Sequence, residues 1–301
     1  MRIVRAMSEH VDGQNPDHRQ AGPTVIRMLV GAQLRRLREN GHITREEAGE
    51  AIRASHSKIS RLELGRTGFK QRDVADLLTL YGVVDDDERA PLLALAAQAN
   101  RPGWWHAYAD VVPSWFDAYL GLEQAASLIR GYEVQFVPEL LQTEDYARAL
   151  IRPACAGAPE FEIERRVALR MERRRLLTGR EPATLWFVID EAVLHRPIGG
   201  LKVLRDQIRH LAEVAELGHV TLQIMPFSAG AAAAATGSAT ILRFPEGELP
   251  DVVYLEQLTG ALYLDKLADV ERYWHVMNRL GIEAEQPAAT TALLHRVLKE
   301  I

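Results

Sequence analysis

Residues 44–65, TREEAGEAIRASHSKISRLELG, predict two short helices joined by a tight turn. Thr44 is placed to cap the first helix through its hydroxyl, and Glu47 follows three residues later, as in a capping box. Alanine and isoleucine then recur at helical spacing and give this helix an apolar face. Ser55 is the expected N-cap of the second helix.

The second of these helices presents polar side chains on one side. Ile59 and Leu62 have the spacing of core residues, which leaves the opposite side to hydrogen-bond donors. A short helix of this kind is what a helix-turn-helix places in the major groove of DNA. Lys58 and Arg61 are the best candidates to donate hydrogen bonds to the O6 and N7 atoms of guanine. The predicted DNA-contacting residues are Thr44, Arg45, His56, Ser57, Lys58, Ser60, Arg61, Arg66 and Lys70.

Residues at the ends of the two helices are expected to hold the DNA backbone. Thr44 and Arg45 begin the first helix, where backbone N–H groups and side chains bind phosphate. Arg66 and Lys70 lie just beyond the second helix and are placed to follow the sugar–phosphate chain. Glu63 is predicted to stabilise the domain internally, because a carboxylate close to phosphate is repelled.

The stretch resembles the XRE, lambda-repressor-like helix-turn-helix family. That family's second helix follows S-x-S-x-I-S-x-[IL]-E-x-G, and this chain matches from Ser55 to Gly65. Arg45 stands where the family often has Gln, so a guanidinium contact replaces an amide contact. Arg53 stands where the turn often has Gly. A positive φ at a non-glycine residue costs strain, so a differently built turn is an open alternative.

The net charge of −5 is distributed unevenly along the 301 residues. Residues 24–72 carry eleven Lys and Arg against five Asp and Glu, a net charge of +6, which leaves −11 for the rest of the chain. This asymmetry favours a basic module facing a polyanion, attached to an acidic body. The alternative is an ordinary solvated helical surface.

Composition favours a cytoplasmic protein without a cofactor. A single cysteine, Cys155, excludes an intrachain disulfide and fits a reducing compartment. No run of 18 apolar residues exists, so a membrane span is not expected, and the N-terminus lacks the apolar core of a signal peptide. No metal-ligand spacing is present either.

Helical patterns organise the N-terminal third of the chain. Two helices flank the quoted stretch on its C-terminal side and one precedes it, which makes a five-helix domain. The sequence Arg101-Pro102-Gly103 marks the boundary to a second domain. The expected segments are a disordered lead-in at 1–22, a DNA-binding domain at 23–100 with further helices at 24–40, 71–81 and 85–100, and a sensing and dimerisation domain at 101–301.

The second domain has mixed periodicity. Helices are expected at 115–130 and 160–178, with an extended segment at 131–138. From Ala183 on, short β-branched and aromatic runs predict strands. Five are expected, LWFVID, HVTLQIMPF, SATILRF, DVVYLEQ and ALYLD, with helices at 200–217, 266–280 and 287–300. The first two strands flank a helix and form a β-α-β unit, whereas the last three are expected to be antiparallel neighbours.

The predicted fold class is therefore α+β. It consists of a five-helix, lambda-repressor-like helix-turn-helix domain followed by a mixed α/β domain with a sheet of about five strands.

The second domain also resembles a known C-terminal module. The motifs VPELLQT, VIDEAVLHRPIGG, QIMPF and VVYLE occur in the order found in WhiJ-like, toxin–antitoxin-like XRE regulators of actinomycetes. The module's function is unassigned, and the resemblance implies a small acidic protein encoded alongside. Glu139 replaces a usual Gly, and alanines at 231–235 stand where a His is common.

Several side chains of this domain are candidate ligand or interface residues. An aromatic cluster at 104–119 is interpreted as core, as a dimer interface or as a ligand pocket. Polar residues isolated in apolar runs either satisfy buried backbone or face a pocket. The candidates are Trp104, Trp105, Tyr108, Trp115, Glu133, Gln142 and Glu191.

Catalysis is not expected. Asp190 and Glu191 with nearby His195 resemble an acid/base or metal set, but a helix cap with ion-paired partners is the favoured interpretation. No nucleophile elbow or phosphate loop accompanies them. Seven arginines at 164–180 predict a solvated helix with Glu–Arg pairs, or alternatively a second nucleic-acid contact.

Two functions from different classes follow. The first is a sequence-specific transcription regulator, expected to bind double-stranded DNA as a homodimer and to sense an effector or partner through its C-terminal domain. The second is an antitoxin-like interaction module that binds a small acidic partner and autoregulates its operon. An enzyme carrying a DNA-binding domain is the least favoured alternative.

Overall fold

The computed structural model describes residues 22–229, 236–245 and 249–301, which form two compact units. Residues up to His106 and 117–125 belong to the first unit, and Ala107–Phe116 and most of the chain from Ala126 belong to the second. The predicted lead-in, apart from Gly22, and the alanines at 231–235 lie outside the described residues. Within the described part, no helix combines the length and the apolar character needed to cross a membrane.

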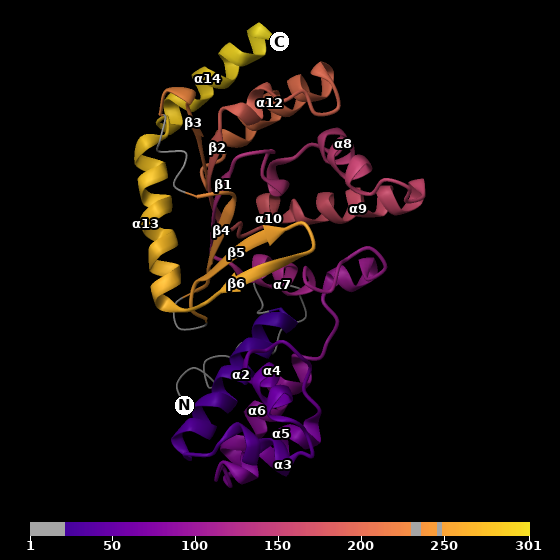
Figure 1. Cartoon of the computed structure of the whole chain (residues 1–301), viewed down its shortest axis with the longest axis vertical. Coiled ribbons are helices and arrows are strands. Elements are labelled where there is room, and N and C mark those ends of the chain that lie inside the picture. Colours follow the sequence, from indigo (N-terminus) through magenta and orange to yellow (C-terminus); the bar gives the residue numbers. More distant parts are fainter. Residues whose placement is uncertain (1–21, 230–235, 246–248) are drawn as a thin grey trace. The chain divides into compact units, whose positions relative to one another are not determined.

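The first unit contains the five predicted helices (Figure 1). Each begins close to its expected position, and two of them carry the predicted side-chain caps. Their bounds are α2 Pro23–Asn40, α3 Arg45–Ala51, α4 His56–Glu63, α5 Gln71–Leu80 and α6 Asp86–Gln98.

The core of the first unit is formed by the inner faces of all five helices. Ile59 and Leu62 of α4 are 1% and 2% exposed, as their spacing predicted. Gly31 of α2 lies against the end of α4, where an added Cβ would be 2.7 Å from the carbonyl oxygen of Glu63. The absence of a side chain at Gly31 therefore allows α2 to cross α4 at close range.

Helix α7 (Asp117–Ala125) packs against α2 within the first unit. Its Gly121 faces Thr24 at a distance too short for a side chain. Asp117 accepts a 2.5 Å hydrogen bond from the indole Nε1 of Trp105 and lies 3.6 Å from the guanidinium of Arg27. A helix was expected at 115–130, but the structure ends it at Ala125.

The second unit is built on a six-stranded sheet in the order β3-β2-β1-β4-β5-β6. The first three strands in the chain run parallel, and the last three pair antiparallel as predicted. The strands are β1 Leu128–Glu133, β2 Thr184–Asp190, β3 Val220–Met225, β4 Ala239–Arg243, β5 Val252–Gln257 and β6 Gly260–Leu264. The predicted β-α-β unit corresponds to β2, α12 and β3.

Strand β1 is the sixth strand, beyond the five expected. Its segment was predicted as the end of a helix and the start of an extended run. The sequence LIRGYE hides the strand, because Arg130 and Gly131 interrupt the apolar pattern of a fully buried strand. Gly131 is needed there, since an added Cβ would be 2.7 Å from the ring of Phe187 on β2.

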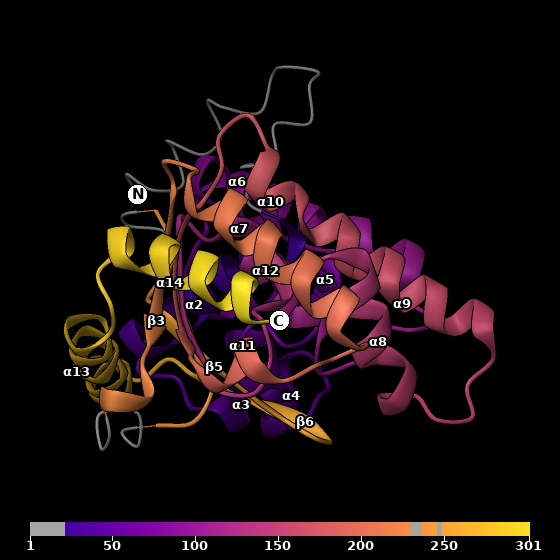
Figure 2. The ribbon, with the colours of Figure 1, turned by 90° about the horizontal axis from the view of Figure 1, so that it is seen from above.

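Helices cover both faces of this sheet (Figures 1 and 2). On one side lies α13, Leu267–Glu283, and on the other lie α8, Glu144–Ala154, α9, Glu160–Arg173, and α12, Leu201–Ala215. Three short elements, η2 Glu139–Leu141, α10 Arg175–Thr178 and α11 Ala192–His195, and the final helix α14, Pro287–Glu300, belong to the same unit. The 3-10 helix η1, Trp104–Tyr108, lies at the change from one unit to the other.

Arg130 joins β1 to α13. Its guanidinium is 2% exposed and donates to Asn278 Oδ1 at 2.5 Å and to the carbonyl oxygen of Met277 at 2.6 Å. It lies 3.7 Å from the ring centroid of Trp186 and 5.4 Å from that of Trp274. Burial lowers the pKa of Arg130 to about 10, so the group stays charged at neutral pH. A buried cation of this kind depends on hydrogen bonds and aromatic faces for its stabilisation.

Replacing Arg130 by Ala should destabilise the second unit by about 3 kcal/mol or more, because the buried carbonyl oxygen of Met277 loses its donor and a packed side chain is removed. Urea unfolding followed by tryptophan fluorescence measures the change. Arg272→Ala, which removes an exposed guanidinium from the same helix α13, is the matched control and should shift stability by less than about 0.5 kcal/mol. Equal stability of the two variants would contradict the role assigned to Arg130.

Candidate DNA-binding surface

The two helices of the opening stretch begin with the caps that the sequence predicts. Thr44 Oγ1 accepts from the N–H of Glu47 at 3.2 Å, and Glu47 Oε2 accepts from the N–H of Thr44 at 2.7 Å, a complete capping box. Ser55 Oγ accepts from the N–H of Lys58 at 3.3 Å. These bonds satisfy backbone donors that a helix N-terminus otherwise leaves open, and so fix where α3 and α4 begin.

The turn between the helices takes the strained form. Arg53 adopts φ of +54°, the left-handed region that a glycine occupies more easily. The N–H of Ala54 donates to the carbonyl oxygen of Gly49 at 2.8 Å and closes the turn. The alternative of a differently built turn is therefore wrong, and the arginine bears the strain.

Helix α4 presents polar side chains to solvent on one side. His56, Ser57 and Arg61 are exposed, whereas Ser60 is half-buried. Ser57 Oγ lies 3.3 Å from His56 Nε2, so these two side chains contact each other at the first turn. Within the described residues, Arg61 makes no ion pair, which leaves its guanidinium available to an outside acceptor.

Lys58 differs from the expectation of an open donor. Its Nζ is 2.7 Å from Asp73 Oδ2 on α5, and its side chain is only 30% exposed. Asp73 lies in the first turn of α5, directly beside α4. A base contact by Lys58 thus requires exchange of this ion pair, and Arg61 becomes the strongest candidate for reading a guanine.

A buried carboxylate organises the region behind this surface. Glu63, at the end of α4, has a side chain that is 2% exposed. Arg38 of α2 donates to Glu63 Oε1 at 2.5 Å and to Oε2 at 3.2 Å. Arg45 of α3 donates to the same Oε2 at 3.2 Å. As the sequence predicted, Glu63 stabilises the domain internally, and through Arg45 it also positions a residue assigned to DNA.

The residues predicted to hold the backbone of DNA lie at the helix ends. Thr44, Arg66 and Lys70 are exposed, and Arg45 keeps 41% of its side chain accessible beside Glu63. Gly65, with φ of +65°, ends α4 and turns the chain toward Arg66. These exposed side chains offer hydroxyl, guanidinium and ammonium donors, the groups that commonly bind phosphate.

The aromatic candidates divide between the two units. Trp105 is 2% exposed in the first unit, where it packs edge-to-face on Trp104 with ring centroids 5.9 Å apart. In the second unit, Tyr108 lies 5.3 Å from the guanidinium of Arg165, and the carbonyl of Trp115 accepts from Tyr263. Trp105 is therefore a core residue, which removes it from the ligand-contacting candidates.

Another candidate, Gln142, belongs to a polar cluster that the sequence did not predict. Gln142 is 1% exposed, donates to the carbonyl oxygen of Val137 at 2.7 Å and accepts from Arg170 at 3.0 Å. Arg170 and Arg173 of α9 both bind Glu139. The prediction that the arginines of this helix face solvent is therefore partly wrong, because the guanidinium groups of Arg170 and Arg173 point inward. The signal in the sequence was Glu139, an acidic residue in the otherwise apolar run Pro-Glu-Leu-Leu, which needs a buried cationic partner.

The pKa values of two carboxyl groups in this region are shifted in opposite directions. Burial favours the neutral form of Glu139, but Arg170 and Arg173 outweigh it and hold its pKa at about 2. Burial raises the pKa of Glu133 to about 8, with a hydrogen bond to Ser238 opposing the shift. Burial therefore favours the protonated form of Glu133.

Glu191 takes a capping role. Its Oε2 accepts from the N–H of Phe227 at 2.7 Å, and its Oε1 lies 3.7 Å from His195 Nε2. Neighbouring Asp190 accepts from the N–H of Ala192 at 2.9 Å. These contacts agree with the helix-cap interpretation. Among the described residues, no group of three or more His, Cys, Asp or Glu has the geometry of a metal site.

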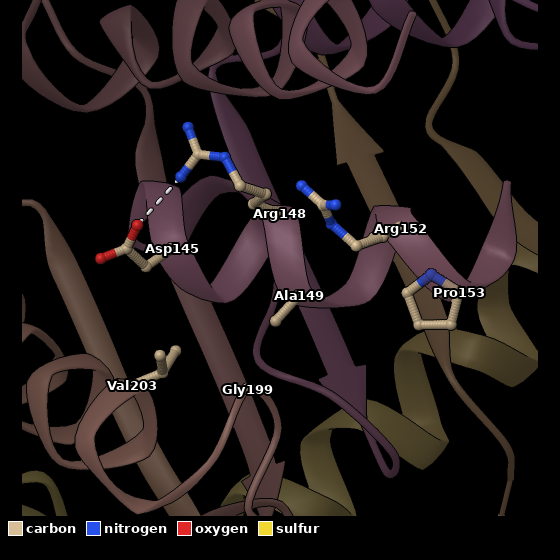
Figure 3. A pocket seen from close by; sticks show the side chains of 7 residues that line it. All are labelled: Asp145, Arg148, Ala149, Arg152, Pro153, Gly199 and Val203. Atoms are coloured by element: carbon tan, nitrogen blue, oxygen red, sulfur yellow. Dashed lines mark hydrogen bonds and ion pairs between the residues drawn. The ribbon is translucent and has the colours of Figure 1, made fainter. Parts of the chain in front are cut away.

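The second unit contains an open recess of about 550 Å³ between α8 and the start of α12 (Figure 3). Asp145, Arg148 and Arg152 form its polar rim, and its floor is largely apolar. Arg148 is neutralised by Glu144, Asp145 and Glu164. None of the residues predicted from the sequence lines this recess.

Two family models match the chain. Residues 116–296 match the family described as Domain of unknown function (DUF5753), and residues 29–92 match the family described as Helix-turn-helix domain. The second match covers α3, the turn and α4, so the chain carries a helix-turn-helix in its first unit. No curated protein and no solved structure matches the chain.

Replacing Glu63 by Ala should destabilise the first unit by about 3–5 kcal/mol, because the buried guanidinium of Arg38 loses its counter-charge. Thermal unfolding followed by circular dichroism measures the loss. Glu50→Ala removes an exposed carboxylate from α3 and is the control, with an expected change within about 0.5 kcal/mol. If both variants have the same midpoint of thermal unfolding as the parent, Glu63 does not organise the domain.

Proposed function

This protein belongs to the DUF5753 family, and we propose that it is a sequence-specific DNA-binding transcription regulator of the XRE type. The observation that carries the proposal is the exposed polar side of α4 within a helix-turn-helix. Arg61 and Ser57 project from a helix whose opposite side is fixed in the core by Ile59 and Leu62. A rigid helix with outward donors can enter the major groove without rearrangement.

The distribution of charge supports nucleic acid as the partner. The net charge of +6 over residues 24–72 contrasts with −11 over the rest of the chain. Cationic residues that bind phosphate release counterions, so the affinity should fall steeply with salt. The helix-turn-helix family favours a regulator over an enzyme, and the protein is proposed to act on double-stranded DNA in the cytoplasm.

The proposed regulator binds as a homodimer. A two-fold symmetric dimer presents two copies of α4 and therefore selects a pseudopalindromic operator. Its half-sites are expected to lie about 10–10.5 bp apart, or a multiple of this spacing. In this proposal the first unit reads DNA and the second unit holds the two chains together.

Selection from a random DNA library with the full chain should yield such an operator. Arg61→Ala should then reduce specific affinity by about 1–3 kcal/mol and relax the preference at one base pair per half-site. Fluorescence anisotropy on the selected operator and on single-base variants measures both effects. Non-specific binding should change far less, because most phosphate contacts remain.

Arg272→Ala is the matched control for this experiment, since it removes one exposed guanidinium from α13 of the second unit. Its operator affinity should equal that of the parent. An Arg61→Ala variant that binds and discriminates like the parent would show that α4 is not the reader. Enrichment of no sequence at all would contradict specific recognition.

A further inference from the structure

Strand β6 forms one edge of the six-stranded sheet (Figure 1). It pairs on one side with β5, from Val253 opposite Leu264 to Gln257 opposite Gly260. On its other side, no strand or backbone hydrogen bond from residues 22–229, 236–245 or 249–301 reaches it. Its outward backbone groups therefore have no backbone partner among the described residues, and such an edge is a ready template for another strand.

The opposite edge of the sheet is treated differently. There β3 is followed on its outer side by the link to α14, and the N–H of Glu285 donates to the carbonyl oxygen of Ile224 at 2.8 Å. Helix α14 also packs along β3. The chain thus covers one edge with a connecting segment and a helix, whereas no described strand pairs with the other edge.

Strand β6 and the turn before it are uncharged and expose two leucines, as is common at protein interfaces. Residues 258–264, LTGALYL, contain no charge and no proline, and the pairing with β5 runs without a bulge. Leu258 at the hairpin is 99% exposed and Leu262 in the strand is 55% exposed. Solitary edge strands are normally protected by lysine, proline or a bulge, and β6 has none of these.

We propose that β6 pairs antiparallel with β6 of a second copy of this chain, joining the two sheets into one. The two-fold axis then runs perpendicular to the sheet through Leu262, which faces Leu262 of the other copy. This pairing is isologous, so each chain offers the same surface and the assembly closes at two. It rests on the proposed function, for which it supplies the dimer interface.

Self-pairing suits this segment because nothing in it repels its own copy. Centred on Leu262, the register sets Leu264 opposite Gly260 and Tyr263 opposite Ala261 of the other chain. Residues 260–264 carry no charge, so no two like charges face each other in this register. A partner with a charged edge would find no opposite charge on this strand. An uncharged strand such as β6 of a second copy is therefore the occupant that we propose.

Disulfide cross-linking tests the axis directly. Cys155 is the only cysteine, so Cys155→Ser gives a background in which Leu262→Cys introduces a single thiol per chain. Directly opposed residues of antiparallel strands have Cβ atoms about 4.5–5.5 Å apart, close to disulfide geometry. Under mild oxidation most of the protein should become covalent dimer. Ile282→Cys in the same background, 77% exposed on α13, should cross-link only marginally.

A charge variant gives a second readout on the reduced protein. Leu262→Lys puts two ammonium groups opposite each other and should weaken the dimer about tenfold or more in sedimentation velocity. Phe161→Lys, a change at a 67% exposed residue of α9, should leave the dimer intact. Circular dichroism establishes that both variants are folded.

Several results would overturn this interface: a parent that sediments as a monomer at micromolar concentrations, a Leu262→Lys variant as dimeric as the parent, or equal cross-linking of the Leu262→Cys and Ile282→Cys variants. Binding of a single operator half-site is measured alongside. A parent that binds no half-site would contradict the proposed function, whereas a Leu262→Lys variant that stays dimeric with half-site binding intact would contradict only the β6 edge.

Discussion

The ion pairs of the buried Glu63 carboxylate are the interaction on which the helix-turn-helix unit of this protein depends. It joins Arg38 of α2 and Arg45 of α3 to the end of α4, so one charge relates three helices. A carboxylate that is 2% exposed is tolerable only when its partners are fully in place, and it therefore penalises any other arrangement of these helices. The outward direction of His56, Ser57 and Arg61 follows from that fixed geometry.

The second unit uses a buried charge of the opposite sign for a similar purpose. Arg130 has no carboxylate among its described contacts, and two hydrogen bonds and the face of Trp186 hold it under α13. Helices cover both faces of the sheet and one of its edges, while no described strand pairs with the outer side of β6. We therefore propose that this uncharged edge joins a second copy and that the first unit contacts DNA.

The sequence predicted the first unit closely because its signals are local. The capping box at Thr44, the N-cap at Ser55 and the internal role of Glu63 needed only spacing and charge. It missed β1, because the apolar pattern of a buried strand is broken by Arg130, whose partner Asn278 lies 148 residues away in sequence. The pairing of Lys58 with Asp73 and the inward turn of Arg170 were equally beyond reach, since each depends on a neighbour that only tertiary packing supplies.

Hydrogen–deuterium exchange of the full chain, with and without its selected operator, tests the central claim most directly. Binding through α4 should slow exchange of the amides at 44–70, where the helix N-termini and the exit turn contact phosphate and bases. The arginine-rich helix α9 should exchange at the same rate in both states. Slowed exchange confined to 160–180, with 44–70 unchanged, would contradict the account and transfer DNA binding to the second unit.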